Sequence, residues 1–413
     1  MTWSPRPIRP DEMDEALDLL AVGFGIGPTC PPDYRAAVTA VTEPDRLFVV
    51  EDEGRLVATG CVLTLRLALP GGGSMPIAGV SEVVVAPSHR RRGLLTAVLE
   101  RLHADAAAHG EPAAALTASE GGIYRRFGYG VATRFQQVVV DARRSAEVEP
   151  VGWPVGAPSP THIVTGPEAD KVLPEVWDRH WRRVPGEVDR TPGWWAEQAL
   201  DPVHGRDGAS ARFVAVHRDP GGRADGYVIY RITQGFGMGG TNHEARIVDL
   251  AAADDVVEAE LLRFVLDVDL VGTVTWLAPV DMPVRWRLAD PRAISVTAER
   301  DQLWVRILDV PAVLAARGYA AEGALTLLVV DDRGLAGGTF RLVAGRDGAS
   351  CTPIDAEPDL VVTVADLGSV VVGATTWATL QRAGRVQPHG TDAVDLADGL
   401  FRTARVAYSG TDF

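Results

Sequence analysis

VVVAPSHRRRGLLTAVLERLH, the stretch from Val83 to His103, joins an apolar strand to an amphipathic helix through a short basic loop. The helical pattern continues to His109 and stops at Gly110, a residue type that commonly ends helices. Upstream, the spacing of apolar residues predicts another helix from Pro10 to Phe24. Strands are predicted at Leu47 to Glu51, Leu56 to Arg66, Gly79 to Ala86, Ala113 to Ala118 and Arg134 to Asp141. Residues 1–146 are therefore expected to form an α+β domain with a mixed sheet flanked by helices.

The rest of the chain of 413 residues is long enough for two further domains. A segment rich in proline and glycine, near residues 147–162, predicts a linker. Beyond it, Ile247 to Asp267 repeats the order of apolar strand, short loop and amphipathic helix, which indicates a diverged second copy of the first domain over residues 147–295. After that the pattern changes, and residues 296–413 are expected to form a third domain. Its first elements are predicted as a strand at Trp304 to Leu308 and a helix at Pro311 to Arg317.

The composition of the chain argues against several classes of function. A formal charge of -15 argues against nucleic acid as a partner and agrees with a cationic substrate. No apolar run approaches the length that crosses a bilayer, and the first residues lack a secretory signal, so we expect a cytoplasmic protein that does not bind membranes. The three cysteines form no CxxC pair, and His103 and His109 lack the i, i+4 spacing of metal ligands. We expect no metal cofactor.

The basic loop has the context of a phosphate site. Backbone N–H groups at the start of a helix bind anions, and nearby arginines add positive charge. Here Arg90, Arg91 and Arg92 follow the strand, and Gly93 lets the backbone approach a ligand closely. An arginine run alone is usually a solvated surface, but its place between a strand and a helix favours binding of a diphosphate.

These residues resemble the GCN5-related N-acetyltransferase superfamily, whose loop reads Arg or Gln, x, x, Gly, x, Gly or Ala. Arg90 to Leu95 fits that pattern except at Leu95, where the superfamily has a small residue. A closer resemblance covers nearly the whole chain: HRRRGLL, then TASEGGIYRRFGYG from Thr117, then a C-terminal phenylalanine, Phe413. This pattern is similar to the Eis (enhanced intracellular survival) acetyltransferases. The resemblance implies tandem acetyltransferase folds, of which only the first is active, followed by a sterol carrier protein-like α+β domain.

The resemblance also implies the residues that contact acetyl-CoA, the expected co-substrate. They come from the strand before the loop, from the loop and helix start, and from the Ser-Glu pair of SEGG. In this chain they are Val83, Val84, Val85, Arg90, Arg91, Arg92, Gly93, Leu94, Leu95, Thr96, Ser119 and Glu120.

Acyl transfer to an amine needs a base for the ammonium proton and an acid for the departing thiolate. By resemblance, Tyr124 is the acid, with Tyr129 as a rival, and the terminal carboxylate of Phe413 is the base. Sequence alone would treat such a chain end as frayed. Glu82, directly before Val83, is the alternative base, because many members of the wider superfamily place a catalytic glutamate there.

The second copy lacks the arginines and the glycine of the phosphate-binding loop. Its loop reads Ala252, Ala253, Asp254, Asp255, and two carboxylates repel phosphates. We therefore expect the second domain to be structural or to wall the acceptor pocket.

Other motifs carry less weight. GFGMGG, with Gly235, Gly237 and Gly240, matches a dinucleotide motif by letter but precedes a strand-like segment, so a glycine-rich hairpin is expected. Four tryptophans in the second domain are expected to pack in its core or to wall the acceptor pocket: Trp177, Trp181, Trp194 and Trp195.

The leading hypothesis is acetyl-CoA-dependent acetylation of an amine by direct transfer in a ternary complex. The resemblance implies aminoglycosides, polyamines or protein lysines as acceptors, and a homohexamer. Asp412 would help to attract a cationic acceptor, whereas Ile26, in a loop expected to line the pocket, adds no negative charge. Two alternatives stay open: a CoA- or lipid-binding protein without catalysis on an acetyltransferase scaffold, and an acyltransferase for longer acyl groups.

Overall fold

The computed structural model describes residues 3–145, 160–237, 240–345 and 348–413. The chain divides into two compact units. Unit 1 contains residues 1–133, 184–197 and 301–413, and unit 2 contains residues 134–183 and 198–300. Most of the predicted linker, residues 147–159, lies outside the described residues, and the three predicted domain boundaries remain predictions. Among the described residues, none of the helices is long and apolar enough to cross a membrane.

Unit 1 is built on a seven-stranded mixed sheet in the order β1-β2-β3-β4-β5-β16-β6. Its strands are β1 (Arg6–Pro7), β2 (Leu47–Asp52), β3 (Arg55–Ala68), β4 (Ser74–Val85), β5 (Ala113–Thr117), β16 (Leu303–Ile307) and β6 (Gly130–Val131). All neighbours are antiparallel except β4 and β5, which are parallel. This parallel pair needs a crossover, and the predicted loop and helix provide it.

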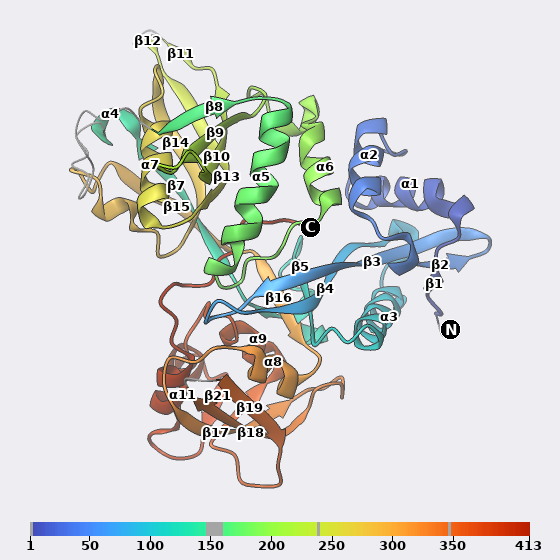
Figure 1. Cartoon of the computed structure of the whole chain (residues 1–413). Helices are drawn as coiled ribbons and strands as arrows, with labels where there is room; N and C mark the ends of the chain where they lie inside the picture. Colours follow the sequence, from blue (N-terminus) through green and yellow to red (C-terminus); the bar gives the residue numbers. More distant parts are fainter. Residues whose placement is uncertain (1–2, 146–159, 238–239, 346–347) are drawn as a thin grey trace. The chain divides into compact units, whose positions relative to one another are not determined.

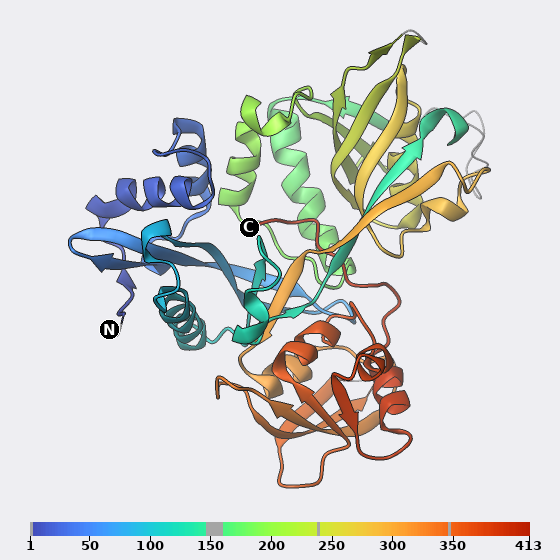
Figure 2. The same cartoon turned by 180° about the vertical axis from the view of Figure 1, so that it is seen from behind.

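Helices cover both faces of this sheet (Figures 1 and 2). On one face lie α1 (Met13–Gly23), which closely matches the predicted helix, and α2 (Pro32–Val41). On the other face lies α3 (Leu94–Ala108), the helix predicted from the opening motif. Its Val98, Leu99 and Leu102 are completely buried against the sheet. Burying each such side chain stabilises the fold by about 1.5–3 kcal/mol.

The C-terminal part of unit 1 has its own five-stranded sheet, in the order β19-β18-β17-β20-β21. Its strands are β17 (Gly323–Val330), β18 (Gly338–Gly345), β19 (Gly348–Pro353), β20 (Leu360–Thr363) and β21 (Val386–Pro388). Its helices are α8 (Val310–Ala316), α9 (Val364–Val370), α10 (Trp377–Arg382) and α11 (Ala393–Phe401). Helix α9 packs directly on the first sheet, since a Cβ at Gly130 would lie 1.7 Å from the carbonyl oxygen of Ala365. The α+β prediction for all these parts is confirmed.

Two strands belong to sheets other than those predicted. The strand at Arg134–Asp141, expected to complete the first domain, is β7, and it pairs with β14 (Val271–Pro279) in unit 2. The strand expected in the third domain at Trp304 to Leu308 is β16 (Leu303–Ile307), and it fills the place between β5 and β6. The reason is main-chain hydrogen bonding: β5 is buried and must have a partner on each side. Local sequence predicts a strand but does not select its partner.

Unit 2 contains the second seven-stranded sheet, in the order β15-β7-β14-β13-β10-β9-β8. Besides β7 and β14, its strands are β8 (Thr161–Val164), β9 (Phe213–Arg218), β10 (Ala224–Thr233), β13 (His243–Ala252) and β15 (Ile294–Asp301). Its helices are α4 (Ala142–Ser145), α5 (Pro167–His180) and α7 (Asp255–Leu266). Helix α6 (Pro192–Leu200) runs from the residues of unit 1 into those of unit 2. The succession of β13 and α7 confirms the predicted repeat of strand, loop and helix.

The glycine-rich segment contains two short strands, as the predicted hairpin requires. They are β11 (Phe236–Gly237) and β12 (Gly240–Thr241), which pair antiparallel. They precede strand β13 and no helix, so this motif does not begin a dinucleotide-binding fold.

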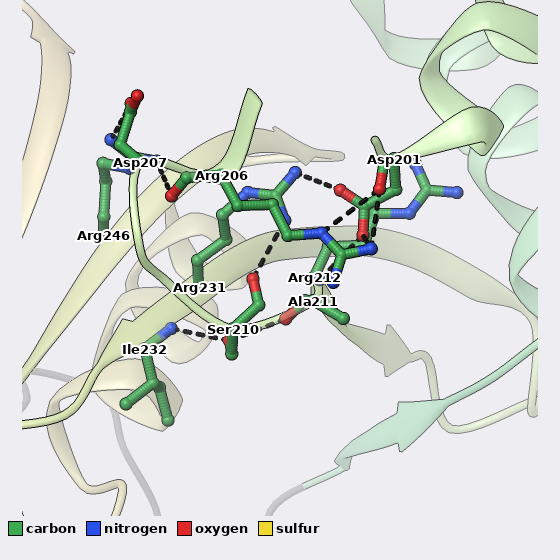
Figure 3. Close-up of polar contacts among 9 residues, drawn as sticks. All are labelled: Asp201, Arg206, Asp207, Ser210, Ala211, Arg212, Arg231, Ile232 and Arg246. Carbon is green, nitrogen blue, oxygen red and sulfur yellow. Dashed lines mark hydrogen bonds and ion pairs between the residues drawn. The ribbon is translucent and has the colours of Figure 1, made fainter. Parts of the chain in front are cut away.

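A cluster of arginines and aspartates attaches the loop after α6 to the sheet of unit 2 (Figure 3). Arg231 and Arg246 lie directly opposite each other on β10 and β13, an arrangement of like charges that is unfavourable alone. The Asp201 carboxylate accepts a hydrogen bond from Arg231 and lies 3.3 Å from Arg206, while Asp207 lies 3.3 Å from Arg246. These contacts offset the repulsion and hold the loop, so the cluster has a structural explanation.

Candidate active site

A gap opens in the first sheet between its two parallel strands. Strand β4 pairs with β5 only at Ala78 with Ala114 and at Gly79 with Ala115. Beyond Gly79 the two strands separate, and in the described part of the chain no strand fills the space between them. The edge of β4 from Ser81 onward therefore presents main-chain groups to a ligand. An extended molecule with amide groups, such as the pantetheine arm of CoA, can bind there as an added strand does.

A bulge at Glu82 bends β4 at this point. Thr59 of β3 pairs with Val84 and Cys61 pairs with Ser81, so one residue of β3 opposes two of β4. Glu82 has a φ of 54°, a left-handed conformation that is uncommon for a residue other than glycine. The Thr59 hydroxyl donates to the Glu82 carbonyl at 2.6 Å and holds this conformation. Such backbone outliers occur often at functional sites.

The three valines after the bulge divide between the two faces of the sheet. Val84 is buried in the cluster of side chains beneath α1, whereas Val83 and Val85 are half-buried on the α3 side. Val83 and Val85 thus face the α3 side of the sheet, and the side chain of Val84 faces α1.

The N-terminus of α3 offers unpaired donors. Gly93 occupies the N-cap position with a φ of 89°, and no side-chain hydrogen bond caps this helix end. Leu94 is buried, so it can reach a ligand only through its backbone, while Leu95 and Thr96 are half-buried in the first turn. The first N–H groups of a helix carry the positive end of its dipole. This end of α3 is therefore suited to bind a diphosphate.

The arginine loop before this helix end is held in place. Arg90, Arg91 and Arg92 are exposed, and Arg91 has a left-handed φ of 62°. The indole N–H of Trp3 donates to the carbonyl of Arg92 at 2.7 Å. The imidazole of His89 lies 3.0 Å from the Asp52 carboxylate. Sequence reasoning did not find Trp3 or Asp52, because no motif links them to the loop.

The matching helix end in unit 2 is already capped. The Asp254 carboxylate accepts hydrogen bonds from the backbone N–H groups of Val256 and Val257, both at 2.9 Å. These donors are thereby satisfied, and the added negative charge opposes a phosphate. The two copies therefore differ in whether the first N–H groups of the helix are capped by a side chain.

The segment after β5 carries the predicted acid. Ser119 and Glu120 follow the end of β5 and are exposed, and Tyr124 begins a short 3₁₀ turn, Tyr124–Phe127. Burial raises the pKa of Tyr124, and the Glu120 carboxylate raises it further. The phenol therefore stays protonated at neutral pH, as a general acid must.

The rival tyrosine lies deeper. Tyr129 is fully buried, and its hydroxyl shares a hydrogen bond of 2.9 Å with Nε2 of His103. Burial raises the Tyr129 pKa and lowers that of His103 to about 3. The Tyr129 ring packs edge-to-face against Tyr124, with 5.9 Å between centroids. Tyr129 thus contacts Tyr124 from a fully buried position.

The chain end is anchored beside β5. A Cβ at Gly79 would lie 3.1 Å from the ring of Phe413, so the ring packs over the last paired residue of β4. The Thr117 hydroxyl, at the end of β5, donates to an oxygen of the Phe413 terminal carboxylate at 3.5 Å. Trp194 donates its indole N–H to the carbonyl of Asp412 at 3.0 Å. Phe413 therefore lies at the gap between β4 and β5.

The alternative base, Glu82, occupies an acidic environment. Burial raises the pKa of Glu82 to about 7, and the Glu197 carboxylate adds to the shift. The Glu82 Oε2 atom is buried and has no hydrogen-bond partner among the described residues. The pKa of Tyr34 on α2 is raised by its own burial and then by Glu82. A ligand with a positive charge would relieve this arrangement.

The four predicted core tryptophans do not form one group. Trp177 and Trp181 are buried in unit 2, as expected for core residues. Trp194 and Trp195 belong to unit 1 and pack edge-to-face with centroids 4.9 Å apart. Sequence distance alone does not show that residues 184–197 join the unit that contains the chain end. Ile26 is 41% exposed in the loop after α1, and the exposed Asp412 accepts a hydrogen bond from Gln302.

Comparison with known families agrees with this geometry. Residues 4–132 and 186–307 each match families described as acetyltransferase (GNAT) domain, and residues 310–409 match the sterol carrier protein domain. The chain is thus a GCN5-related N-acetyltransferase, and the fold implies acetyl-CoA as the acetyl donor.

Relatives that align with nearly the whole chain identify the family within this superfamily. An uncharacterized N-acetyltransferase of Streptomyces avermitilis is 34% identical, over 97% of this chain and 96% of its own. N-acetyltransferase Eis of Mycobacterium tuberculosis is 34% identical over 90% of each chain. The crystal structure of Eis1 from Mycobacterium abscessus superimposes with a TM-score of 0.85 and 31% identity, covering both chains completely. The chain belongs to the Eis family of N-acetyltransferases.

The arginine loop generates a prediction about CoA binding. Replacing Arg91 and Arg92 together with glutamine removes two positive charges beside the α3 N-terminus. We expect the dissociation constant for CoA to rise about 10-fold or more, because hydrogen bonds to charged groups contribute about 1.5–3 kcal/mol. Calorimetric titration measures this. Arg263→Gln on α7, an exposed arginine paired with Asp267, is the control and should leave affinity unchanged. Equal affinity in the double variant would contradict the assignment.

Glu82 generates a prediction about pH. Its folded pKa of about 7 lies above the ordinary value of 4.5, so the folded protein binds this proton more tightly than the unfolded chain. The resulting stabilisation is present below pH 4.5 and is lost as the pH rises through 7. Glu82→Gln should therefore gain stability relative to wild type between pH 5 and pH 8. Thermal midpoints of both proteins across this range test it, and a difference that does not change with pH would contradict it.

Proposed function

We propose that this enzyme transfers the acetyl group of acetyl-CoA directly to a primary amine within a ternary complex. The uncapped N-terminus of α3 at one end of the β4/β5 gap, with Tyr124 and Phe413 at the other, carries the proposal. The diphosphate would bind at Gly93 and the arginine loop, and the pantetheine arm along β4. Ser119 and Glu120, just past β5, are proposed as further contacts.

The proposed reaction needs no acyl-enzyme. A neutral amine attacks the thioester carbonyl carbon and gives a tetrahedral intermediate. The terminal carboxylate of Phe413 takes the ammonium proton, and the C–S bond then breaks. The Tyr124 phenol donates its proton to the leaving CoA sulfur. The raised pKa of Tyr124 supports its role as an acid, and the fixed position of Phe413 supports its role as a base.

Glu82 is retained as the alternative base. Its pKa of about 7 suits proton transfer at neutral pH, and its carboxylate is held by a bulge at the same gap. Glu82 lies only a few residues along β4 from Gly79, and the Phe413 ring packs over Gly79. The two candidate bases are therefore attached close to each other on this strand. Variants of each distinguish them.

We further propose a cationic acceptor, such as an aminoglycoside, a polyamine or a lysine side chain. Support comes from the net charge of -15 and from the carboxylates of Glu82 and Glu197, which influence each other. We also propose a homohexamer, on the basis of the family resemblance, and a cytoplasmic location, on the basis of the sequence.

The acid assignment predicts the behaviour of Tyr124→Phe. In a panel of polyamines, aminoglycosides and lysine peptides, wild type should release thiol from acetyl-CoA. Tyr124→Phe should lower kcat about 100-fold or more, because the proton donor is lost, with affinity for acetyl-CoA unchanged. Tyr129→Phe is the matched control and should retain activity. Binding of acetyl-CoA by wild type without release of thiol on any amine would instead support a non-catalytic binding protein.

The base assignment predicts the effect of lengthening the chain. Adding Gly-Ser-Gly after Phe413 moves the terminal carboxylate away from β5, so kcat should fall about 100-fold, the cost of misplacing a reacting group. Glu82→Gln should keep most of its activity. The opposite pattern, with activity lost in Glu82→Gln and kept after extension, would assign the base to Glu82.

A further inference from the structure

Residues 408–412, just before the last residue of the chain, contact one short segment, residues 184–197, which sequence analysis did not connect with the active site. This segment is fixed to the first sheet by main-chain hydrogen bonds. Ala68 at the end of β3 donates to the carbonyl of Glu187 at 2.7 Å, and Asp189 donates to the carbonyl of Arg66 at 3.0 Å. Val188 forms a bridge with Leu67. The segment is therefore part of the rigid framework of unit 1 and can serve as a reference position for the chain end.

The side chain of Glu187 turns from this framework toward the tail. Its Oε2 atom accepts a hydrogen bond from the backbone N–H of Gly410 at 2.8 Å, and its Oε1 atom accepts one from the Ser409 hydroxyl at 3.1 Å. The Thr411 hydroxyl also donates to this carboxylate, as does the backbone N–H of Val188. Three consecutive residues of the tail thus wrap around a single carboxylate.

The Glu187 carboxylate is buried and needs hydrogen-bond donors around it. Glu187 is only 4% exposed, and burial raises its pKa, with the nearby Arg190 and the tail hydrogen bonds acting in the opposite direction. Arg190 in turn donates to the Thr411 hydroxyl at 3.0 Å and stacks on the ring of Trp194. A buried carboxylate costs free energy unless donors surround it, and here the donors come mainly from the tail.

We propose that Glu187 is a positioning residue for the reaction: it places the terminal carboxylate of Phe413 in the active site. Only two residues separate Thr411 from the terminal carboxylate, a reach of at most about 7 Å for an extended chain. Fixing residues 409–411 therefore fixes the carboxylate to within a small volume beside β5. The proposal rests on the proposed role of Phe413 as the base.

A glutamine at position 187 could not accept the same hydrogen bonds from the tail. A carboxylate offers acceptor positions on both oxygens, whereas a glutamine of the same shape has only one acceptor oxygen and presents N–H donors on the other side. In Glu187→Gln a donor of the tail would therefore face another donor. The tail should leave its place in part of the molecules, and misplacement by about 1 Å is enough to cost about 100-fold in rate.

The test is a double-mutant cycle between Glu187→Gln and the Gly-Ser-Gly extension of Phe413. Alone, Glu187→Gln should lower kcat about 10- to 100-fold while the dissociation constant for acetyl-CoA stays within twofold of wild type. In the extended protein, where the carboxylate is already displaced, Glu187→Gln should cause no further loss of kcat. A purely structural role predicts the same loss in both backgrounds, which would overturn the proposal.

Glu111→Gln is the matched control. Glu111 is also 4% exposed, accepts hydrogen bonds from the buried Arg46, and lies outside the active site. It should lower the thermal midpoint without changing kcat at a temperature where the protein remains folded.

The outcomes separate the two proposals. Unchanged kcat after extension alone would refute Phe413 as the base, and with it the proposed role of Glu187. Loss of kcat after extension, together with wild-type kcat in Glu187→Gln, would refute only the role of Glu187.

Discussion

Unsatisfied backbone groups in the first domain are the constraint on which the rest of its site depends. The donors at the start of α3 have no side-chain cap, and the edge of β4 beyond Gly79 has no neighbouring strand in the described chain. Polar backbone groups left without partners are costly, so both features require a ligand or water. We propose that the diphosphate of CoA binds at the start of α3 and that its amide-containing arm binds along the edge of β4. In the second domain Asp254 satisfies two of the equivalent donors from within the chain, and its negative charge opposes a phosphate there.

A chain end is an unusual place for a proposed catalytic group, since termini usually lose order. Here the loss of conformational freedom is offset by contacts with residues 184–197 on one side and by packing of Phe413 over Gly79 on the other. The proposed acid lies on the turn after β5 and the proposed base at the end of the chain, so the two groups have different attachments. Tyr124 is held by its own domain and by Tyr129, whereas Phe413 depends on residues nearly 230 positions earlier in the sequence, such as Glu187. The proposed active site therefore draws on all three segments of unit 1.

Local sequence was sufficient for the elements with strong periodicity. The strand-loop-helix motif from Val83, with its helix ending before Gly110, and the repeat at Ile247 are predictable because apolar spacing and helix-ending residues act over short distances. Strand partners were not predictable: the pattern of Arg134–Asp141 is the same whichever sheet it joins, and the unfilled edge of β5 selects β16 instead. The bulge at Glu82, the cap-free start of α3 and the Glu187 contacts likewise depend on tertiary neighbours. The position of Phe413 was suggested only by family resemblance, since nothing in its local sequence distinguishes it from a disordered end.

The most direct measurement replaces the terminal carboxylate of Phe413 with a carboxamide. Joining a synthetic C-terminal peptide to the rest of the chain yields two proteins that differ only in carrying a carboxylate or a carboxamide at Phe413. Single-turnover acetyl transfer from bound acetyl-CoA to a polyamine is then compared at neutral pH. We predict that the carboxamide binds acetyl-CoA normally but transfers the acetyl group about 100-fold more slowly or worse, because the proton acceptor is absent. Equal rates for the two proteins would contradict the central claim that the chain end acts as the base.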